Sequence, residues 1–219
     1  PARVPDQGQT LDRRNRMRQI FLIFLISFSQ VMLTGCGSTT PSRFDLLTPV
    51  EAQQPGAATL QAPAVGIGPV TFPAYLDRSE IALRSGGNEI HYAGSHRWAT
   101  SLKTAFSHTL SENLSILLPT DKTLVYPWSR STRLDYQLMV NVTRFDAATD
   151  GTVVLAVSWN IIRSSDNAVI KRNRVSYTEA AGGTDYAAIV AAQSRVVERL
   201  SRDVAAVIHS DGSRAALPG

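Results

Sequence analysis

YQLMVNVTRFDAATDGTVVLAVSWNI, residues 136–161, alternates apolar and polar side chains on both sides of a short turn. The apolar positions are Tyr136, Leu138, Val140 and Val142 before the turn at 149–151, and Val153, Leu155, Val157, Trp159 and Ile161 after it. A second polar turn at 164–167 leads to a third run with Val169, Val175 and Tyr177. A period of two predicts strands with one buried face, and tight connections predict antiparallel neighbours. The sequence therefore predicts a three-stranded antiparallel meander.

Two segments outside the meander repeat apolar residues every three or four positions, as amphipathic helices do. The first covers 96–118, with Ser95 as its expected N-cap and Pro119 as its stop, and the second covers 185–209 after Thr184. Their apolar stripes are Trp98, Leu102, Phe106, Leu110, Leu114 and Leu117 in the first, and Tyr186, Ile189, Val190, Val197, Leu200, Val204 and Ile208 in the second. We expect a buried core that contains Trp98, Phe106, Leu110, Leu155, Val157 and Trp159.

Short strands are expected at 43–47, 65–72, 79–84 and 89–93, whereas 48–64 carries three prolines without periodicity and is typical of a loop. Gly66 and Gly68 indicate close packing rather than a phosphate loop, because no third glycine follows at the required spacing. Helices and half-apolar strands together predict an α+β fold with two layers, a mainly antiparallel sheet with two amphipathic helices packed on one face.

The sequence contains a single cysteine, Cys36, which excludes a disulfide within the chain. It follows a basic segment at 13–18 and an apolar run at 20–33, in the order that a secretory signal requires. That run is shorter than the roughly 20 apolar residues of a spanning helix. Leu33-Thr34-Gly35-Cys36 also resembles the bacterial lipobox, in which the cysteine thiol carries a diacylglyceryl group and the chain is cut before it.

These features predict that residues 1–35 are a lipoprotein signal peptide and that Cys36 is the lipidation site, with acyl chains such as palmitate. If Met17 is the first translated residue, Arg18 and the new amino terminus supply the n-region charge. Gly37 stands where an aspartate would typically retain a lipoprotein in the inner membrane, so the sequence favours the outer membrane of a Gram-negative bacterium.

The mature chain is predicted to have a lipidated tether at 36–42, one domain at 43–210 and a flexible tail at 211–219. We expect Phe44, Leu46 and Leu47 to be too apolar for solvent, so that a first strand begins right after a short tether. If these residues are not part of the sheet, the tether extends to Ala64 instead.

The charge of the mature part is close to balanced. Residues 1–35 contain five arginines and two aspartates, which leaves 17 basic and 16 acidic residues in 36–219. Nucleic-acid binding usually needs a strongly basic face, so the composition argues against a nucleic-acid partner.

The sequence gives little sign of catalysis, metal binding or a cofactor. The four histidines, His91, His96, His108 and His209, have no partner at metal-binding spacing. Ser95 and His96 are neighbours, but a nucleophile and its base need convergent side chains, which adjacent residues rarely provide. The sequence therefore predicts a non-enzymatic protein.

Binding surfaces often lie on irregular segments between strands, and the segment 72–78 combines aromatic, apolar and charged residues in such a place. Its residues Tyr75, Leu76, Asp77 and Arg78 are the candidate partner-binding residues, and a core-plugging loop is the equally weighted alternative. Tyr126-Pro127-Trp128 poses the same question, with a buried turn favoured. Arg172 and Arg174 share a strand face and form either a basic strip or an ordinary solvated one.

Three stretches, VGIGPVTFPAYLDRSEIALR at 65–84, HRWATSLKTAFSHTLSENLSILL at 96–118 and VYPW at 125–128, together with the meander, resemble the auxiliary lipoproteins of ABC-type transport systems, the PqiC (YmbA) group. The resemblance runs from the lipobox to about Ile208. It implies an outer-membrane lipoprotein on the periplasmic face that acts as the partner of a periplasm-spanning MCE-type protein in lipid transport, without catalytic residues.

Two readings of the function therefore follow. In the first, the chain is a docking component of an ABC/MCE-type lipid transport system, and it could also form a homo-oligomer. In the second, the lipoprotein itself binds a lipid or small ligand in a cavity between helices and sheet.

Overall fold

The predicted meander forms the long antiparallel part of an eight-stranded sheet in the computed structural model, which describes residues 17, 20–22, 41–51 and 62–215. Its strands are β6 (Tyr136–Ala148), β7 (Thr152–Arg163) and β8 (Ala168–Ala180). Val140 lies opposite Trp159 in the register, and each is at most 2% exposed. The apolar positions of β6 and β7 therefore face the core, as predicted, whereas Val169 near the start of β8 is 48% exposed and does not.

The remaining strands extend the sheet from the other edge of β6. Strand β2 (Val65–Thr71) runs parallel to the first half of β6, and β3 (Glu80–Ser85) runs parallel to its end. Strand β4 (Glu89–Trp98) is antiparallel to β3, β1 (Arg43–Asp45) is parallel to β4, and β5 (Thr123–Val125) is parallel to β2. The sheet is mainly antiparallel because β3–β4 and the meander contain most of its residue pairs.

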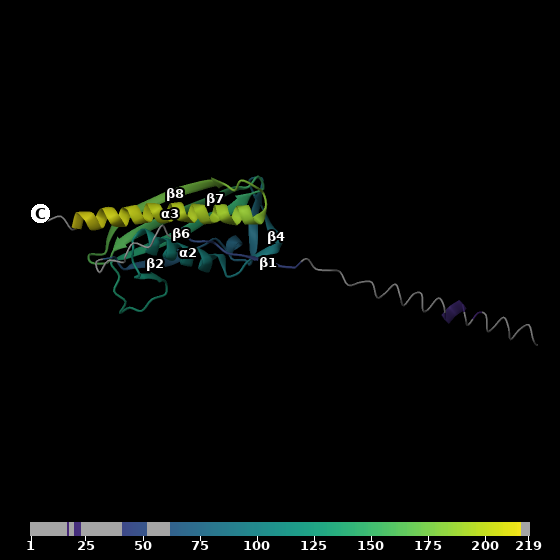
Figure 1. Cartoon of the computed structure of the whole chain (residues 1–219), viewed down its shortest axis with the longest axis horizontal. Coiled ribbons are helices and arrows are strands. Elements are labelled where there is room, and N and C mark those ends of the chain that lie inside the picture. The colour runs from purple at the N-terminus through teal and green to yellow at the C-terminus, as the bar shows by residue number, and fades with distance from the viewer. Residues whose placement is uncertain (1–16, 18–19, 23–40, 52–61, 216–219) are drawn as a thin grey trace, which may run out of the picture. The chain divides into compact units, whose positions relative to one another are not determined.

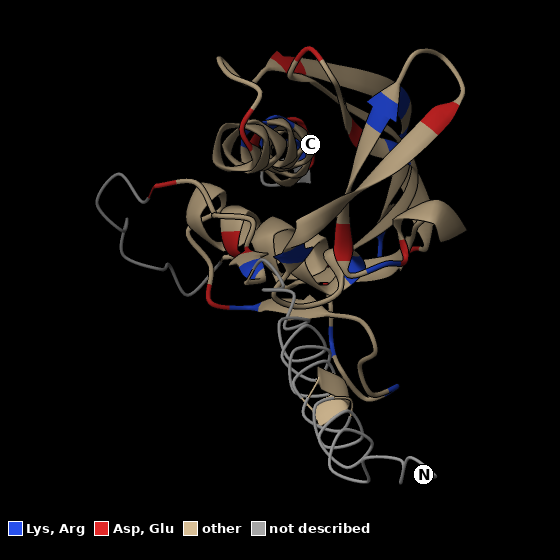
Figure 2. Cartoon of the chain, turned by 90° about the vertical axis from the view of Figure 1, so that its right-hand side faces the viewer, with Lys and Arg blue, Asp and Glu red and all other residues tan. Residues whose placement is uncertain are grey.

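Two long helices lie side by side against this sheet (Figure 1). They are α2 (Leu102–Leu117) and α3 (Tyr186–Ala215), and a short 3-10 turn, η1 (Ala74–Leu76), follows β2. Seen along its axis, α3 lies on the concave side of the curved sheet (Figure 2). The predicted α+β fold with two helices on one face is confirmed.

Aromatic side chains fill the centre of the interface between the helices and the sheet. Phe106 of α2 is fully buried and meets Phe72 and Phe145 edge to face, with ring centroids 5.3 and 5.7 Å away. The six side chains predicted to form the core are all buried, at 4% exposure or less: Trp98, Phe106, Leu110, Leu155, Val157 and Trp159. The space between the layers is therefore packed with side chains.

The first helix begins later than the sequence pattern predicts. Residues 96–98 belong to β4, and the N-cap is Ser101, whose hydroxyl accepts a hydrogen bond from the Thr104 amide at 3.2 Å. The prediction of Ser95 as the N-cap was wrong because Trp98, at the end of a strand, stands four residues before Leu102. Both residues are buried, so their four-residue separation resembles helical spacing although only Leu102 lies in the helix.

The second helix also differs at both ends. The carboxylate of Asp185, rather than Thr184, accepts a hydrogen bond from the Ala188 amide at 3.0 Å and caps the helix. Helix α3 continues to Ala215, so the segment 211–219 that was predicted as a flexible tail begins inside a helix, while 216–219 lie outside the described residues. Asp211 holds this last turn through hydrogen bonds to β6 and β7.

The first strand buries only part of the apolar segment that precedes the proline-rich loop. Leu47 is buried, but Phe44 is 68% exposed and Leu46 is 55% exposed, so the expectation that all three avoid solvent was wrong for two. Alternate residues of a strand point to opposite sides, and Asp45 and Leu47 take the inward side here. The backbone then crosses the helices, because the Thr48 amide donates to Ser194 of α3 and the Val50 amide donates to Asn113 of α2.

Candidate functional site

Tyr75, the first of the candidate partner-binding residues, is tied to a buried carboxylate. Its hydroxyl donates a hydrogen bond to Asp146 of β6 at 2.8 Å, and Asp146 is fully buried. Arg84 and Arg144 also donate to Asp146, with their nearest nitrogens 2.8 Å from its oxygens. Tyr75 therefore closes an ion-pair cluster that joins the η1 turn to β3 and β6.

The cluster shifts the acid–base behaviour of both partners. Burial, followed by the hydrogen bond to the Asp146 carboxylate, raises the pKa of Tyr75 to about 12. Burial by itself would raise the pKa of Asp146, but hydrogen bonds from Arg84, Arg144 and Tyr75 outweigh it and lower that pKa below its ordinary value. Asp146 is thus held as a carboxylate, and the cluster has a structural role.

The rest of the predicted loop divides between core and surface. Leu76 is 4% exposed and packs in the core, whereas Asp77 and Arg78 are exposed. The Arg78 guanidinium lies over the Tyr92 ring, 4.7 Å from its centroid. Asp77 and Arg78 border a small depression of about 370 Å³ together with Trp98 and Ser101. Of the four candidate residues, these two offer the side chains that a partner can reach.

The loop Tyr126-Pro127-Trp128 packs on β2 at a position where only glycine fits. A Cβ on Gly66 would lie 2.5 Å from Leu134 and 2.9 Å from the Trp128 ring, and a Cβ on Gly68 would lie 2.5 Å from that of Tyr126. The prediction that these glycines serve close packing is confirmed. Trp128 is half-buried by this contact, but Tyr126 is 54% exposed, so the loop is both a packed turn and an aromatic surface.

An open depression of about 990 Å³ lies beside this loop. Its apolar lining includes the half-buried Trp128 and, more deeply buried, Leu118 and Ile208, which are only 3% and 2% exposed, and Arg133 and His209 are among its polar groups. Arg133 is exposed and forms no ion pair with any residue that the structure describes. An apolar wall beside a free guanidinium suits an amphipathic or acidic ligand.

The wall of this depression is held by a second charged cluster. Arg163 of β7 donates through Nε to Asp211 of α3 at 2.9 Å, and the Tyr136 hydroxyl donates to the same carboxylate at 3.0 Å. The hydrogen bond from Arg163 is the main cause that lowers the pKa of Asp211, while burial and the contact with Asp211 raise the pKa of Tyr136 to about 12. These contacts fix the end of α3 against the start of β6.

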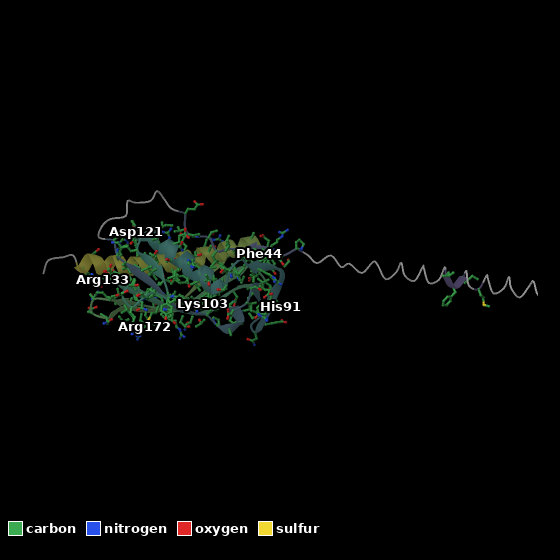
Figure 3. The ribbon with its side chains drawn as sticks, turned by 90° about the horizontal axis from the view of Figure 1, so that it is seen from below. Phe44, His91, Lys103, Asp121, Arg133 and Arg172 are labelled. Carbon is green, nitrogen blue, oxygen red and sulfur yellow. The ribbon has the colours of Figure 1, made fainter. Side chains whose placement is uncertain are left out.

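The candidate lipidation site, Cys36, lies outside the described residues. The folded domain begins at Ser42, and β1 starts at the next residue, Arg43. Among the residues that can be described, none of the helices combines the length and the apolar character needed to cross a bilayer. Phe44 of β1 and Arg133 of the depression lie at opposite ends of the domain (Figure 3).

A family model for the ABC-type transport auxiliary lipoprotein component matches residues 44–205, which cover the domain from β1 to most of α3. The chain belongs to this family. The resemblance seen in the sequence is thereby confirmed, and the family description is that of a transport component rather than an enzyme.

Two solved structures share the fold of this auxiliary lipoprotein. The crystal structure of an uncharacterised protein is 19% identical, with a TM-score of 0.63, and the match covers 77% of this chain and 99% of that one. Protein XCC0632 from Xanthomonas campestris is 18% identical, with a TM-score of 0.54 and coverage of 72% and 94%. No curated protein matches the chain.

One arrangement in the auxiliary lipoprotein resembles part of a catalytic triad. His96 Nδ1 lies 2.9 Å from an oxygen of Asp45, and the His96 ring stacks on Tyr186 with centroids 4.2 Å apart. Ser95 is the neighbouring residue on β4, so its side chain points to the opposite side of the strand. This places the hydroxyl away from the base, and the His96–Asp45 pair instead fastens β1 to the domain.

Metal binding has no support in the part of the chain that is described, since no group of three potential ligands occurs there. Sequence reasoning missed both charged clusters, around Asp146 and around Asp211. The sequence does contain a local signal for the bend of β6 beside Asp146, because its apolar positions change from even numbers to odd ones between Val142 and Phe145, but this signal does not identify the charged partners. That change marks the register shift that the structure has at this place.

Proposed function

We propose that the chain is a lipoprotein of the outer membrane, anchored at the periplasmic face through lipidated Cys36, and that it docks a periplasm-spanning MCE-type protein. In this role it is a non-enzymatic auxiliary component of an ABC-type lipid transport system. The observation that carries the proposal is the family match over 44–205, which covers the folded domain. The near-balanced charge of residues 36–219 and the signal-like residues before Cys36 agree with it.

The contact with the transport protein is proposed to include Asp77 and Arg78. Both side chains are exposed, and the segment that carries them is anchored by Leu76 in the core and by the Tyr75–Asp146 hydrogen bond. A rigid surface loses less conformational entropy on binding than a mobile loop does. The loop is thus both the core-plugging element and the support of a binding surface.

Lipidation gives the first prediction. A Cys36→Ser variant should accumulate as an unprocessed precursor without the acyl mass, because the thioether that precedes cleavage cannot form. Mass spectrometry of the membrane fraction measures both the mass and the amino terminus. A variant that is cut normally and stays bound to the membrane would contradict the lipobox assignment.

Partner docking gives the second prediction. Asp77→Ala combined with Arg78→Ala should weaken binding of the transport protein about tenfold, which corresponds to about 1.4 kcal/mol. Photo-crosslinking in membranes, followed by capture of the lipoprotein, measures the yield of crosslinked partner. Asp121→Ala with Arg130→Ala is the matched control, since it also removes one exposed charge of each sign. Unchanged crosslinking in the first variant would remove the loop from the interface.

A second candidate function is direct binding of a lipid or small ligand. The sequence predicted the ligand cavity between helices and sheet, but buried side chains fill that space in the structure. The depression lined by Trp128, Leu118 and Ile208 is the observation that favours this candidate. Titration of the full chain with a fluorescent phospholipid distinguishes the two functions, because stoichiometric binding that a Trp128→Ala variant loses would support a ligand site.

A further inference from the structure

Strand β1 and the residue after it expose two large apolar side chains at the place where the chain enters the domain. Phe44 is 68% exposed and Leu46 is 55% exposed. Within 42–51 and 62–215, the part of the domain that is described, no other large apolar side chain is as exposed as these two, and the next is Tyr126 at 54%. Such a pair costs solvation free energy unless something covers it.

Phe44 and Leu46 cannot turn inward, because the residues that alternate with them are fixed. Asp45 is bound to His96 at 2.9 Å, and its carbonyl accepts a hydrogen bond from the Ala99 amide at 3.0 Å. Leu47 is buried, and the Thr48 amide is bonded to Ser194 of α3 at 3.1 Å. The register of β1 thus presents Phe44 outward, and the fixed positions of Asp45 and Leu47 leave Leu46 exposed as well.

Cations accompany the exposed pair. Arg43 precedes Phe44, is exposed, and has no ion pair with any described residue. Arg97 lies opposite Phe44 in the parallel register, so their side chains emerge on the same side, and it forms an ion pair with Glu80 at 3.6 Å. Apolar side chains flanked by arginines are the combination that binds the interface of an anionic bilayer.

We propose that Phe44 and Leu46 insert into the headgroup–acyl boundary of the membrane that carries lipidated Cys36, and so hold the domain in one orientation. The proposal rests on the proposed lipid anchor. From Gly37 to Arg43 the chain has seven residues and reaches at most about 25 Å when fully extended. The tether thereby keeps this end of the domain near the phospholipid surface at a high effective concentration, at which a weak contact is occupied.

A phospholipid surface fits this patch better than a protein partner does. Two side chains, one on the three-residue edge strand β1 and one directly after it, offer far less area than the roughly 800 Å² per partner of a standard protein interface. Insertion of a few apolar side chains into a bilayer needs no such area. The opposite end of the domain, where Arg133 lies, would then face away from the membrane (Figure 3).

The test places a fluorophore at the patch in the lipidated full chain. Cys36 is the only cysteine in the sequence, and lipidation consumes its thiol, so Leu46→Cys supplies the only free thiol for a nitrobenzoxadiazole label. In vesicles of phosphatidylethanolamine and phosphatidylglycerol, the label at position 46 should shift its emission to shorter wavelength. A lipid with a nitroxide at the headgroup–acyl boundary should quench most of it. Leu124→Cys, on the edge strand β5 and 40% exposed in the native chain, is the matched control and should show neither effect.

Flotation of the vesicles separates the possible outcomes. A chain that floats with the vesicles and shows the shift and the quenching at position 46 alone supports the inference. A chain that floats but keeps an aqueous, unquenched label at position 46 overturns it and leaves the lipid anchor intact. A chain that does not float contradicts the anchor and the inference together. A second variant, Phe44→Ser with the label at position 46, should lose most of the quenching without leaving the vesicles, and unchanged quenching would also overturn the inference.

Discussion

Replacement of Phe106 by alanine should lower the free energy of unfolding by about 3–5 kcal/mol, the range expected when a fully buried phenylalanine is truncated. The side chain has no exposed surface and meets Phe72 and Phe145 edge to face. Phe145 lies in β6 and Phe72 directly follows β2, so the cavity cannot be closed by a small movement of one element. Urea unfolding followed by circular dichroism measures the change.

Phe44→Ala is the matched control for this prediction. It removes the same side chain from a position that is 68% exposed, and surface substitutions usually change stability by less than about 0.5 kcal/mol in solution. A loss under about 1 kcal/mol for Phe106→Ala would place that face of α2 in solvent and contradict the two-layer packing. Equal effects of the two substitutions would do the same.

The sheet and the two helices could be predicted because their apolar residues follow two different periods. The alternation at 136–161 needs only local information, and it places Trp159 and Val140 on one face, as the structure confirms. The ends of the elements were less predictable. A buried residue at the end of a strand and a buried residue at the start of the next helix can stand four positions apart, as two residues on one helical face do. Trp98 and Leu102 show this case, and the N-cap at Ser101 was therefore missed.

Phe44 and Leu46 show a different limit of the sequence. Their apolar character predicted burial, but the pairing of β1 with β4 places Phe44 on the outer side, and Leu46, which follows β1, is exposed as well. Which side of a short edge strand faces the core depends on its register, and a shift of one residue reverses every side chain. A three-residue strand contains too little pattern to fix that register.

The charged clusters could not be predicted from local pattern, because they join residues far apart in the chain. Tyr75 and Asp146 are 71 residues apart, and Arg163 and Asp211 are 48 apart. The sequence therefore identified the segment around Tyr75 as unusual without the partner that explains it. Asp77 and Arg78 remain candidates for partner binding because Tyr75 is bonded to Asp146 while their own side chains stay exposed.

Asp146→Ala should be the other strongly destabilising substitution, with a loss of about 3 kcal/mol in the free energy of unfolding. Removal of one partner from a buried ion pair costs about 3–5 kcal/mol because the remaining charge is left uncompensated. Asp146 is fully buried, whereas the side chains of Arg84 and Arg144 are 19% and 33% exposed and can partly rehydrate. The loss should therefore lie near the lower end of that range. Asp166→Ala, which removes a 50% exposed partner of Arg163, is the control and should cost less than about 1 kcal/mol.

The pH dependence of unfolding tests whether charge, rather than shape, accounts for that loss. Because the pKa of Asp146 is lowered in the folded chain, the unfolded chain takes up the proton first as the pH falls. The stabilisation is therefore complete above the unfolded pKa of about 3.9 and is lost as the pH falls through the lower folded value. Asp146→Asn keeps the shape but cannot titrate, so the difference in stability between the native chain and this variant should be large at neutral pH and should shrink in acid. A difference that stays constant down to the acid limit would show that Asp146 acts through packing, and the assignment of the Arg84–Asp146–Arg144 cluster as an ionic joint between β3 and β6 would then fail.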